Sequence, residues 1–208
     1  MYQFTVPMAL ADFVPEAFFA VTAVLLLKDL YKKVSAAAFV LLAAGLVNVF
    51  AAGFCKALWK LLYAAGVCDF TVLEKMFLPV NSIGLLLAGA AMPAALSRKK
   101  GECLLSAAPA AFMGSLPFIA MMVLGMGSLC AGLSVLSARM KKGRLAIWFI
   151  LAFVLSMAMG YLSGQDPTLA RVNWAEQAVN SLSQLCLMLG TVKLHKAGLK
   201  TPLREAAL

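Results

Sequence analysis

Long stretches without a charged residue constrain this chain more than any other feature. Val34–Cys55 and Met76–Ser97 each run for 22 residues without Asp, Glu, Lys or Arg, Leu145–Gln165 runs for 21, and Cys103–Ala138 runs for 36. About 20 apolar residues of helix cross the roughly 30 Å hydrocarbon core of a bilayer. Lipid admits only helices and closed barrels, and these stretches lack the alternation of barrel strands. We therefore expect an all-α, polytopic membrane protein.

The positions of these stretches predict seven transmembrane helices. The 36-residue stretch would be about 54 Å long as one helix, so it must be divided. Ser115 suits a helix cap and Pro117 suits a first turn, which places the division just before them. The short fourth segment either spans the membrane or re-enters it. The predicted helices are Phe13–Tyr31, Ser35–Tyr63, Thr71–Leu96, Glu102–Met113, Leu116–Arg139, Arg144–Leu162 and Arg171–Leu194.

Positively charged residues fall in every second connection between these helices. Lys and Arg collect in cytoplasmic loops, so the alternation predicts seven crossings of the cell membrane, with the amino terminus outside and the carboxyl terminus in the cytoplasm. The same placement accounts for the net charge of +9, and we expect no nucleic-acid partner. The basic groups are Lys28, Lys32 and Lys33; Arg98, Lys99 and Lys100; Arg139, Lys141, Lys142 and Arg144; and Lys193, Lys196, Lys200 and Arg204.

A weak internal repeat within this single membrane domain (1–208) agrees with the topology. A shift of 102 residues lays Glu74 on Glu176 and Pro15 on Pro117. Equivalent helices of two triplets share an orientation only if one further crossing separates the triplets. The result is a 3+1+3 arrangement with parallel repeats, a layout that occurs among transporters. The repeats are 13–96 and 116–195, with Glu102–Met113 as the linker helix.

This layout resembles that of the SWEET and PQ-loop transporters, in which a linker helix joins two three-helix bundles. The resemblance covers the architecture only. At the sites of the Pro-Gln signature of those families, this sequence has Pro15-Glu16 and Pro117-Phe118. The resemblance therefore implies a transporter-like fold, and no functional residue is carried over from those families.

Polar residues inside the predicted helices mark candidate binding positions. The clearest set is on the last helix, where Glu176, Asn180 and Gln184 are four residues apart and share one face. Such residues are costly in a membrane and usually face the interior of a bundle. The alternative is that they hydrogen-bond neighbouring helices, for about 0.6 kcal/mol each. The candidate substrate-binding residues are Glu16, Asn48, Glu74, Asn81, Glu176, Asn180 and Gln184.

The acidic residues gather on the predicted external side. Carboxylates at the starts of three helices would crowd one vestibule, which suits a cationic or zwitterionic small molecule or a proton-coupled one. Lys56, Lys60, Lys75 and Arg171 are available to neutralise them. The external acidic residues are Asp12, Glu16, Asp69, Glu74, Asp166 and Glu176.

The chain lacks the catalytic and nucleotide-binding motifs that would name a reaction. No P-loop, serine-hydrolase or zinc-protease motif occurs, and the five cysteines and one histidine lack metal-ligand spacing, so we expect neither cofactor nor metal. The leading hypothesis is a small-solute transporter, or its membrane-embedded binding subunit, with a polar site open to the extracytoplasmic side. Whether the protein is an enzyme stays open. The alternatives are an intramembrane enzyme acting on a lipid or isoprenoid and a receptor-like or scaffolding protein, and a homo-oligomer or a partner membrane subunit is compatible with any of these.

Overall fold

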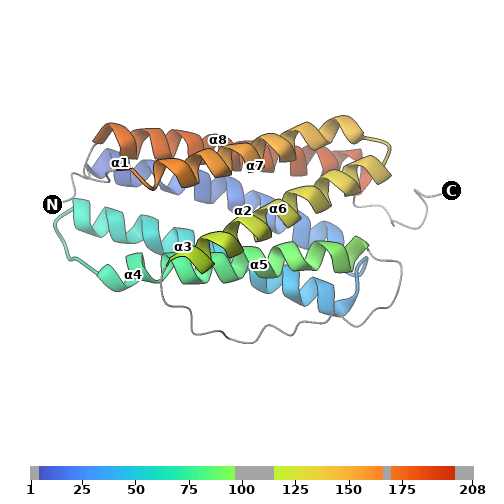
Figure 1. The fold of residues 1–208 in the computed structure, drawn as a ribbon, viewed down its shortest axis with the longest axis horizontal. Helices are drawn as coiled ribbons and strands as arrows, with labels where there is room; N and C mark the ends of the chain where they lie inside the picture. The colour runs from blue at the N-terminus through green and yellow to red at the C-terminus, as the bar shows by residue number, and fades with distance from the viewer. Residues whose placement is uncertain (1–4, 97–114, 166–169, 200–208) are drawn as a thin grey trace.

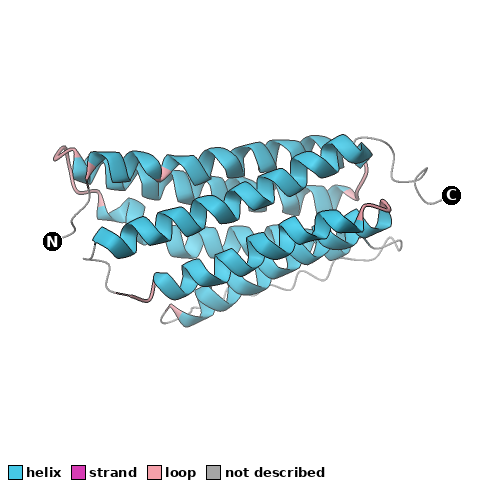
Figure 2. Cartoon of the chain, turned by 90° about the horizontal axis from the view of Figure 1, so that it is seen from above, coloured by secondary structure: helices cyan, strands magenta, loops and turns pink. Residues whose placement is uncertain are grey.

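A computed structural model describes residues 5–96, 115–165 and 170–199. Within these ranges every regular element is a helix (Figure 1), and Figure 2 shows only helices and the loops between them. The predicted helix Glu102–Met113 lies outside the described residues. Six long segments form the bundle: α1 (Val6–Ala11) with α2 (Phe13–Leu30); α3 (Ala36–Ala64); α4 (Thr71–Lys75) with α5 (Phe77–Leu96); α6 (Leu116–Arg139); η1 (Gly143–Leu145) with α7 (Ala146–Leu162); and α8 (Ala170–Leu194) with η2 (His195–Leu199).

Two of the six segments are interrupted, and a proline explains each break. A proline has no N–H, and its ring clashes with the carbonyl four residues earlier. The first helix of one segment ends at Ala11, four residues before Pro15, and the first helix of another ends at Lys75, four residues before Pro79. The helix α1 was not predicted from the sequence. The first break leaves Asp12 between two helices, at the edge of the bundle interior.

The six segments close into a ring. Each contacts the next in the order α2, α3, α5, α6, α7, α8 and back to α2. Helices α5 and α6 run in the same direction, because Arg139 at the end of α6 donates a 2.9 Å hydrogen bond to the carbonyl of Leu96 at the end of α5. Helices α2 and α8 are also parallel, with Asp12 beside Gln177 and Asp29 beside His195. Helices α3 and α7 run the opposite way.

Glycines let the helices of one side approach closely. A Cβ added to Gly45 of α3 would overlap the backbone of Ala88 in α5, and one added to Gly89 of α5 would overlap the backbone of Gly125 in α6. Small residues at such contacts bring membrane helices into van der Waals contact along their backbones. This side of the ring is therefore a rigid three-helix wall of α3, α5 and α6.

The two ends of the ring differ in charge. We call the end where α2, α5, α6 and α8 begin the acidic end; it carries α1 and α4 and lies at the left of Figure 1. Its described acidic residues are Asp12, Glu16, Asp69, Glu74 and Glu176. We call the other end the basic end. Its described basic residues are Lys28, Lys32, Lys33, Arg139, Lys141, Lys142, Arg144, Lys193 and Lys196.

The outer surface is apolar and suits contact with lipid. Five segments are long and apolar enough to cross a membrane: Val6–Leu30, Ala36–Ala64, Thr71–Leu96, Leu116–Arg139 and Gly143–Leu162. The last of these is only 11% buried inside the protein, and its Ile150 and Val154 are more than half exposed. Such a continuous apolar face is unusual in water and normal in a bilayer. The sixth segment, α8, is as long but more polar, because one of its faces lines the site described next.

Candidate functional site

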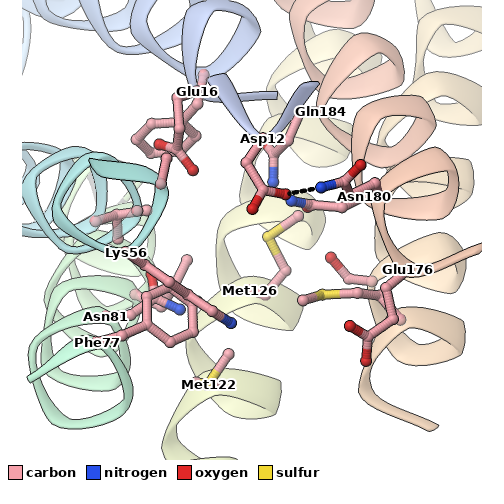
Figure 3. Close-up of a pocket in the computed structure, with 18 of the residues that line it drawn as sticks. Asp12, Glu16, Lys56, Phe77, Asn81, Met122, Met126, Glu176, Asn180 and Gln184 are labelled. Atoms are coloured by element: carbon pink, nitrogen blue, oxygen red, sulfur yellow. Dashed lines mark hydrogen bonds between the residues drawn. The ribbon is translucent and has the colours of Figure 1, made fainter. Parts of the chain in front are cut away.

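A cavity of about 120 Å³ lies inside the ring at the acidic end, and every one of the six long segments contributes to its wall (Figure 3). Charged, amide, thioether and aromatic side chains surround it. The cavity extends from the acidic end toward the middle of the bundle, because its lining residues Asp12 and Lys60 lie near helix ends whereas Gln184 lies near the middle of α8. The polar lining residues are Asp12, Glu16, Lys56, Lys60, Asn81, Ser156, Glu176, Gln177, Asn180 and Gln184, and the apolar ones include Phe19, Phe77, Met122, Met126 and Met159.

Asp12 joins three parts of the ring. Its carboxylate pairs with the ammonium of Lys60 on α3 at 2.8 Å and accepts a 2.7 Å hydrogen bond from Nε2 of Gln177 on α8. The same Nε2 donates to the carbonyl of Met8 at 2.7 Å. Charge-assisted hydrogen bonds are the stronger ones in proteins. The Asp12 carboxylate is therefore held by its own protein partners.

Glu16 lies one helical turn after Asp12 and enters the cavity from the same face of α2 (Figure 3). Its carboxylate rests on Gly53 of α3, where any Cβ would overlap it. A side chain at position 53 would displace the carboxylate from this position. No described residue forms an ion pair with Glu16.

Lys56 approaches the cavity from α3, one turn before Lys60. Its ammonium lies 4.2 Å from the centre of the Phe77 ring, a cation–π contact with α5. Figure 3 shows this ammonium reaching past Phe77 toward the space between α3 and α8. As for Glu16, no described residue forms an ion pair with Lys56.

Helix α8 lines the opposite side with Glu176, Asn180 and Gln184, which are spaced four residues apart (Figure 3). The Oε1 atoms of Gln184 and Gln177 are buried and have no hydrogen-bond partner in the described part of the chain. Native proteins seldom leave a buried polar atom unpaired, because each such atom costs about 1–3 kcal/mol. These two acceptors therefore indicate a missing donor.

Five of the seven predicted binding residues line this cavity: Glu16, Asn81, Glu176, Asn180 and Gln184. Asn48 and Glu74 are not in its lining. Asn48 precedes the lining residue Val49, so it points about 100° away on the helix. Glu74 lies in α4, and the break at Met76 separates it from Asn81 in α5, so the two are not on one uninterrupted helix.

The sequence interpretation missed two pairing roles. Gln177 was not a candidate, although it falls four residues after Asn173 and thus near the same face as the predicted stripe. Lys60 was expected to neutralise one of the external acidic residues, but the sequence did not single out Asp12 as its partner. Their pairing depends on α2 packing between α3 and α8, which no spacing within one helix encodes.

Known proteins offer no relative from which a role could be carried over. No protein-family model, curated protein or solved structure matches the chain. Within the described ranges, no group of three or more His, Cys, Asp or Glu side chains could hold a metal ion. The chemistry of the cavity itself is therefore the basis for a functional proposal.

Proposed function

We propose that the chain is a membrane transporter for a small cationic or zwitterionic solute, or the membrane-embedded binding subunit of one. The observation that carries this proposal is the central cavity, to which all six long segments contribute charged or polar or thioether groups. A charge in the middle of a membrane helix costs about 2.5–3.5 kcal/mol on insertion scales. Helix packing alone does not require Glu16, Lys56 and Glu176 to face one space, whereas solute binding does.

The proposed site opens to the outside of the cell membrane, with the amino terminus external and the carboxyl terminus cytoplasmic. The gathering of basic residues at one end supports this orientation, because Lys and Arg are enriched on the cytoplasmic side. A fluorescent protein that folds only in the cytoplasm should be bright when it is fused after Leu208. A dark fusion at normal expression would reverse the orientation.

The orientation includes a seventh crossing between Leu96 and Leu116. Helices α5 and α6 are parallel neighbours, so the chain that connects them joins opposite ends of the bundle. A crossing needs about 20 residues, which is close to the length of this connection. A cysteine at Ser115, in a background without the native cysteines, should react with a membrane-impermeant thiol reagent applied from outside. Reaction from the cytoplasmic side alone would contradict the seventh crossing.

A cysteine in place of Asn180 tests the function without a known substrate. In the cysteine-free background, a charged thiol reagent should reach this position from outside if the cavity is a solvated binding site. Reaction from the cytoplasmic side as well, in inside-out vesicles, identifies a transporter rather than a binding subunit. Ser137, which is buried at the basic end, is the matched control and should stay unreactive as a cysteine. No reaction at position 180 from either side would favour a scaffold.

A further inference from the structure

The charged groups of the cavity fall into two sets. Asp12 and Lys60 neutralise each other at 2.8 Å. Glu16, Glu176 and Lys56 face the same space and form no ion pair with any described residue. All three are partly buried, and a charge partly removed from water is stabilised by a partner of opposite sign, so the second set favours a solute that carries both signs.

The unpaired amide oxygens of Gln177 and Gln184 indicate which kind of group is missing beside α8. Only 5% of Gln177 is exposed. Its Nε2 donates both of its hydrogen bonds, to Asp12 and to the carbonyl of Met8, whereas its Oε1 has no partner among the described residues. The Oε1 of Gln184 is also buried and unpartnered. Both atoms are acceptors, so the group missing beside α8 is a donor, such as an ammonium.

We propose that the cavity binds a small zwitterion of the α-amino-acid type, with its ammonium among Glu16, Glu176 and Gln184 and its carboxylate at Lys56. This inference rests on the proposed function and names the substrate class of the same site. The cavity volume of about 120 Å³ admits a solute of roughly ten non-hydrogen atoms, at 10–15 Å³ for each water-sized group. The thioethers of Met122 and Met126 offer an adaptable apolar wall for the rest of the solute.

Solutes of a single charge fit the same groups less well. A simple cation would leave Lys56 without an anionic partner from the solute. A simple anion would face two unpaired carboxylates, and like charges at close range repel strongly in a low-dielectric site. Only a solute with both charges provides Lys56 and the two glutamates with partners at once.

Three forms of the same amino acid that carry different charges test the proposal on the purified full-length protein in detergent. For each of alanine, threonine and methionine, the free L-amino acid is compared with its amide, which is a cation, and its N-acetyl derivative, which is an anion. Binding is measured by calorimetry and by the shift in melting temperature. At least one free amino acid should bind about tenfold or more tightly than its two derivatives, as expected for the loss of one charge-assisted contact.

Substitutions test which residue binds the carboxylate of the solute and which binds its ammonium. Lys56→Met should weaken the free amino acid about tenfold and leave the cationic amide bound as tightly or more tightly, because a like charge is removed, whereas Glu16→Gln should weaken both. Lys75→Met is the matched control, because Lys75 is exposed and outside the cavity lining. If Lys56→Met does not fold, the order of the three probes on the unmodified protein still decides.

Two outcomes would overturn the zwitterion. One is that no free amino acid binds; the other is that an amide or an N-acetyl derivative binds best. Either result leaves the proposed function standing if the cysteine at position 180 reacts, because that reaction does not depend on the charge of the solute. Conversely, an unreactive cysteine together with tight binding of a zwitterion would contradict transport and not the substrate class.

Discussion

At the acidic end of the ring, Glu16, Lys56 and Glu176 face a cavity, whereas at the basic end buried apolar side chains fill the interior. The same six segments build both ends, so the difference lies in the residues that each helix turns inward. The inward residues at the basic end are Leu30, Leu42, Met92, Leu136, Leu194 and Leu199, all nearly inaccessible. Their packing stabilises the ring, and the acidic end can therefore carry groups that do not help the chain to fold.

Each end also holds one paired carboxylate, and the one at the basic end is the more deeply buried. Lys60 lies 2.8 Å from Asp12 at the acidic end, and His195 lies 2.8 Å from Asp29 at the basic end. The Asp29 side chain is 1% exposed and is not in the lining of the cavity. Lys33 donates a hydrogen bond to the carbonyl of Leu199 next to this pair, and burial lowers the pKa of Lys33 while Asp29 raises it. The basic end is thus closed by contacts between α2, the turn after it and the end of α8.

The largest loss of stability should follow from His195→Leu. This change leaves the Asp29 carboxylate buried and unpaired, for which we expect a loss of about 3 kcal/mol in the free energy of unfolding. The double variant Asp29→Leu with His195→Leu removes both partners and should recover most of that loss. Denaturant or thermal unfolding in detergent measures both values. Equal destabilisation in the single and double variants would mean that the pair does not close this end.

The next largest effect should come from the glycine contact between α5 and α6. Gly89→Ala places a methyl group on the backbone of Gly125, and we expect a loss of about 2 kcal/mol because the two helices must move apart. Gly160→Ala is the matched control, since nothing lies within 4 Å of a Cβ at that position. If both variants unfold at the same temperature, close backbone packing is not what holds the rigid wall.

At the acidic end, the variant that corresponds to His195→Leu is Lys60→Met. It also leaves a carboxylate without its cation, yet Gln177 still donates to Asp12 and cavity water can reach it. We expect a loss of about 1 kcal/mol, clearly smaller than for His195→Leu although the two ion pairs have the same length. A loss as large as that of the basic-end variant would show that the cavity is dry.

The same contrast explains what could be read from the sequence. The predicted helix Leu116–Arg139 coincides with α6, because Pro117 stands in its first turn and a basic residue ends it. The side chain of Ser115 makes no cap hydrogen bond, so the predicted serine cap is not confirmed. The stripe of Glu176, Asn180 and Gln184 was visible because helical spacing alone puts the three on one face. These features are local, so a single sequence carries them.

Features that depend on which helices become neighbours could not be predicted from the sequence. The partner of Asp12 follows from α2 lying between α3 and α8, and Glu74, which lies before the break that precedes α5, is not in the cavity lining. Pro79 is visible in the sequence, but its position there does not say which side chains the break before it redirects. Contacts between helices, rather than patterns within them, decide these points.

The smallest expected effect separates two adjacent residues of α8. Ser183 is buried and donates a 2.8 Å hydrogen bond to the carbonyl of Ala152 in α7, whereas the buried Oε1 of Gln184 has no partner. Ser183→Ala should therefore cost about 0.6 kcal/mol of stability, the typical value for such a bond between membrane helices, and leave solute binding intact.

Gln184→Leu should do the reverse. Removing an unsatisfied buried acceptor at similar size leaves stability unchanged or slightly raised, while a donor on the solute loses its partner and binding weakens. Melting temperature and amino-acid binding, measured on both variants side by side, distinguish the two roles. A drop in stability for Gln184→Leu with binding unaffected would mean that Gln184 joins helices as Ser183 does, and the cavity would lose its deepest polar contact.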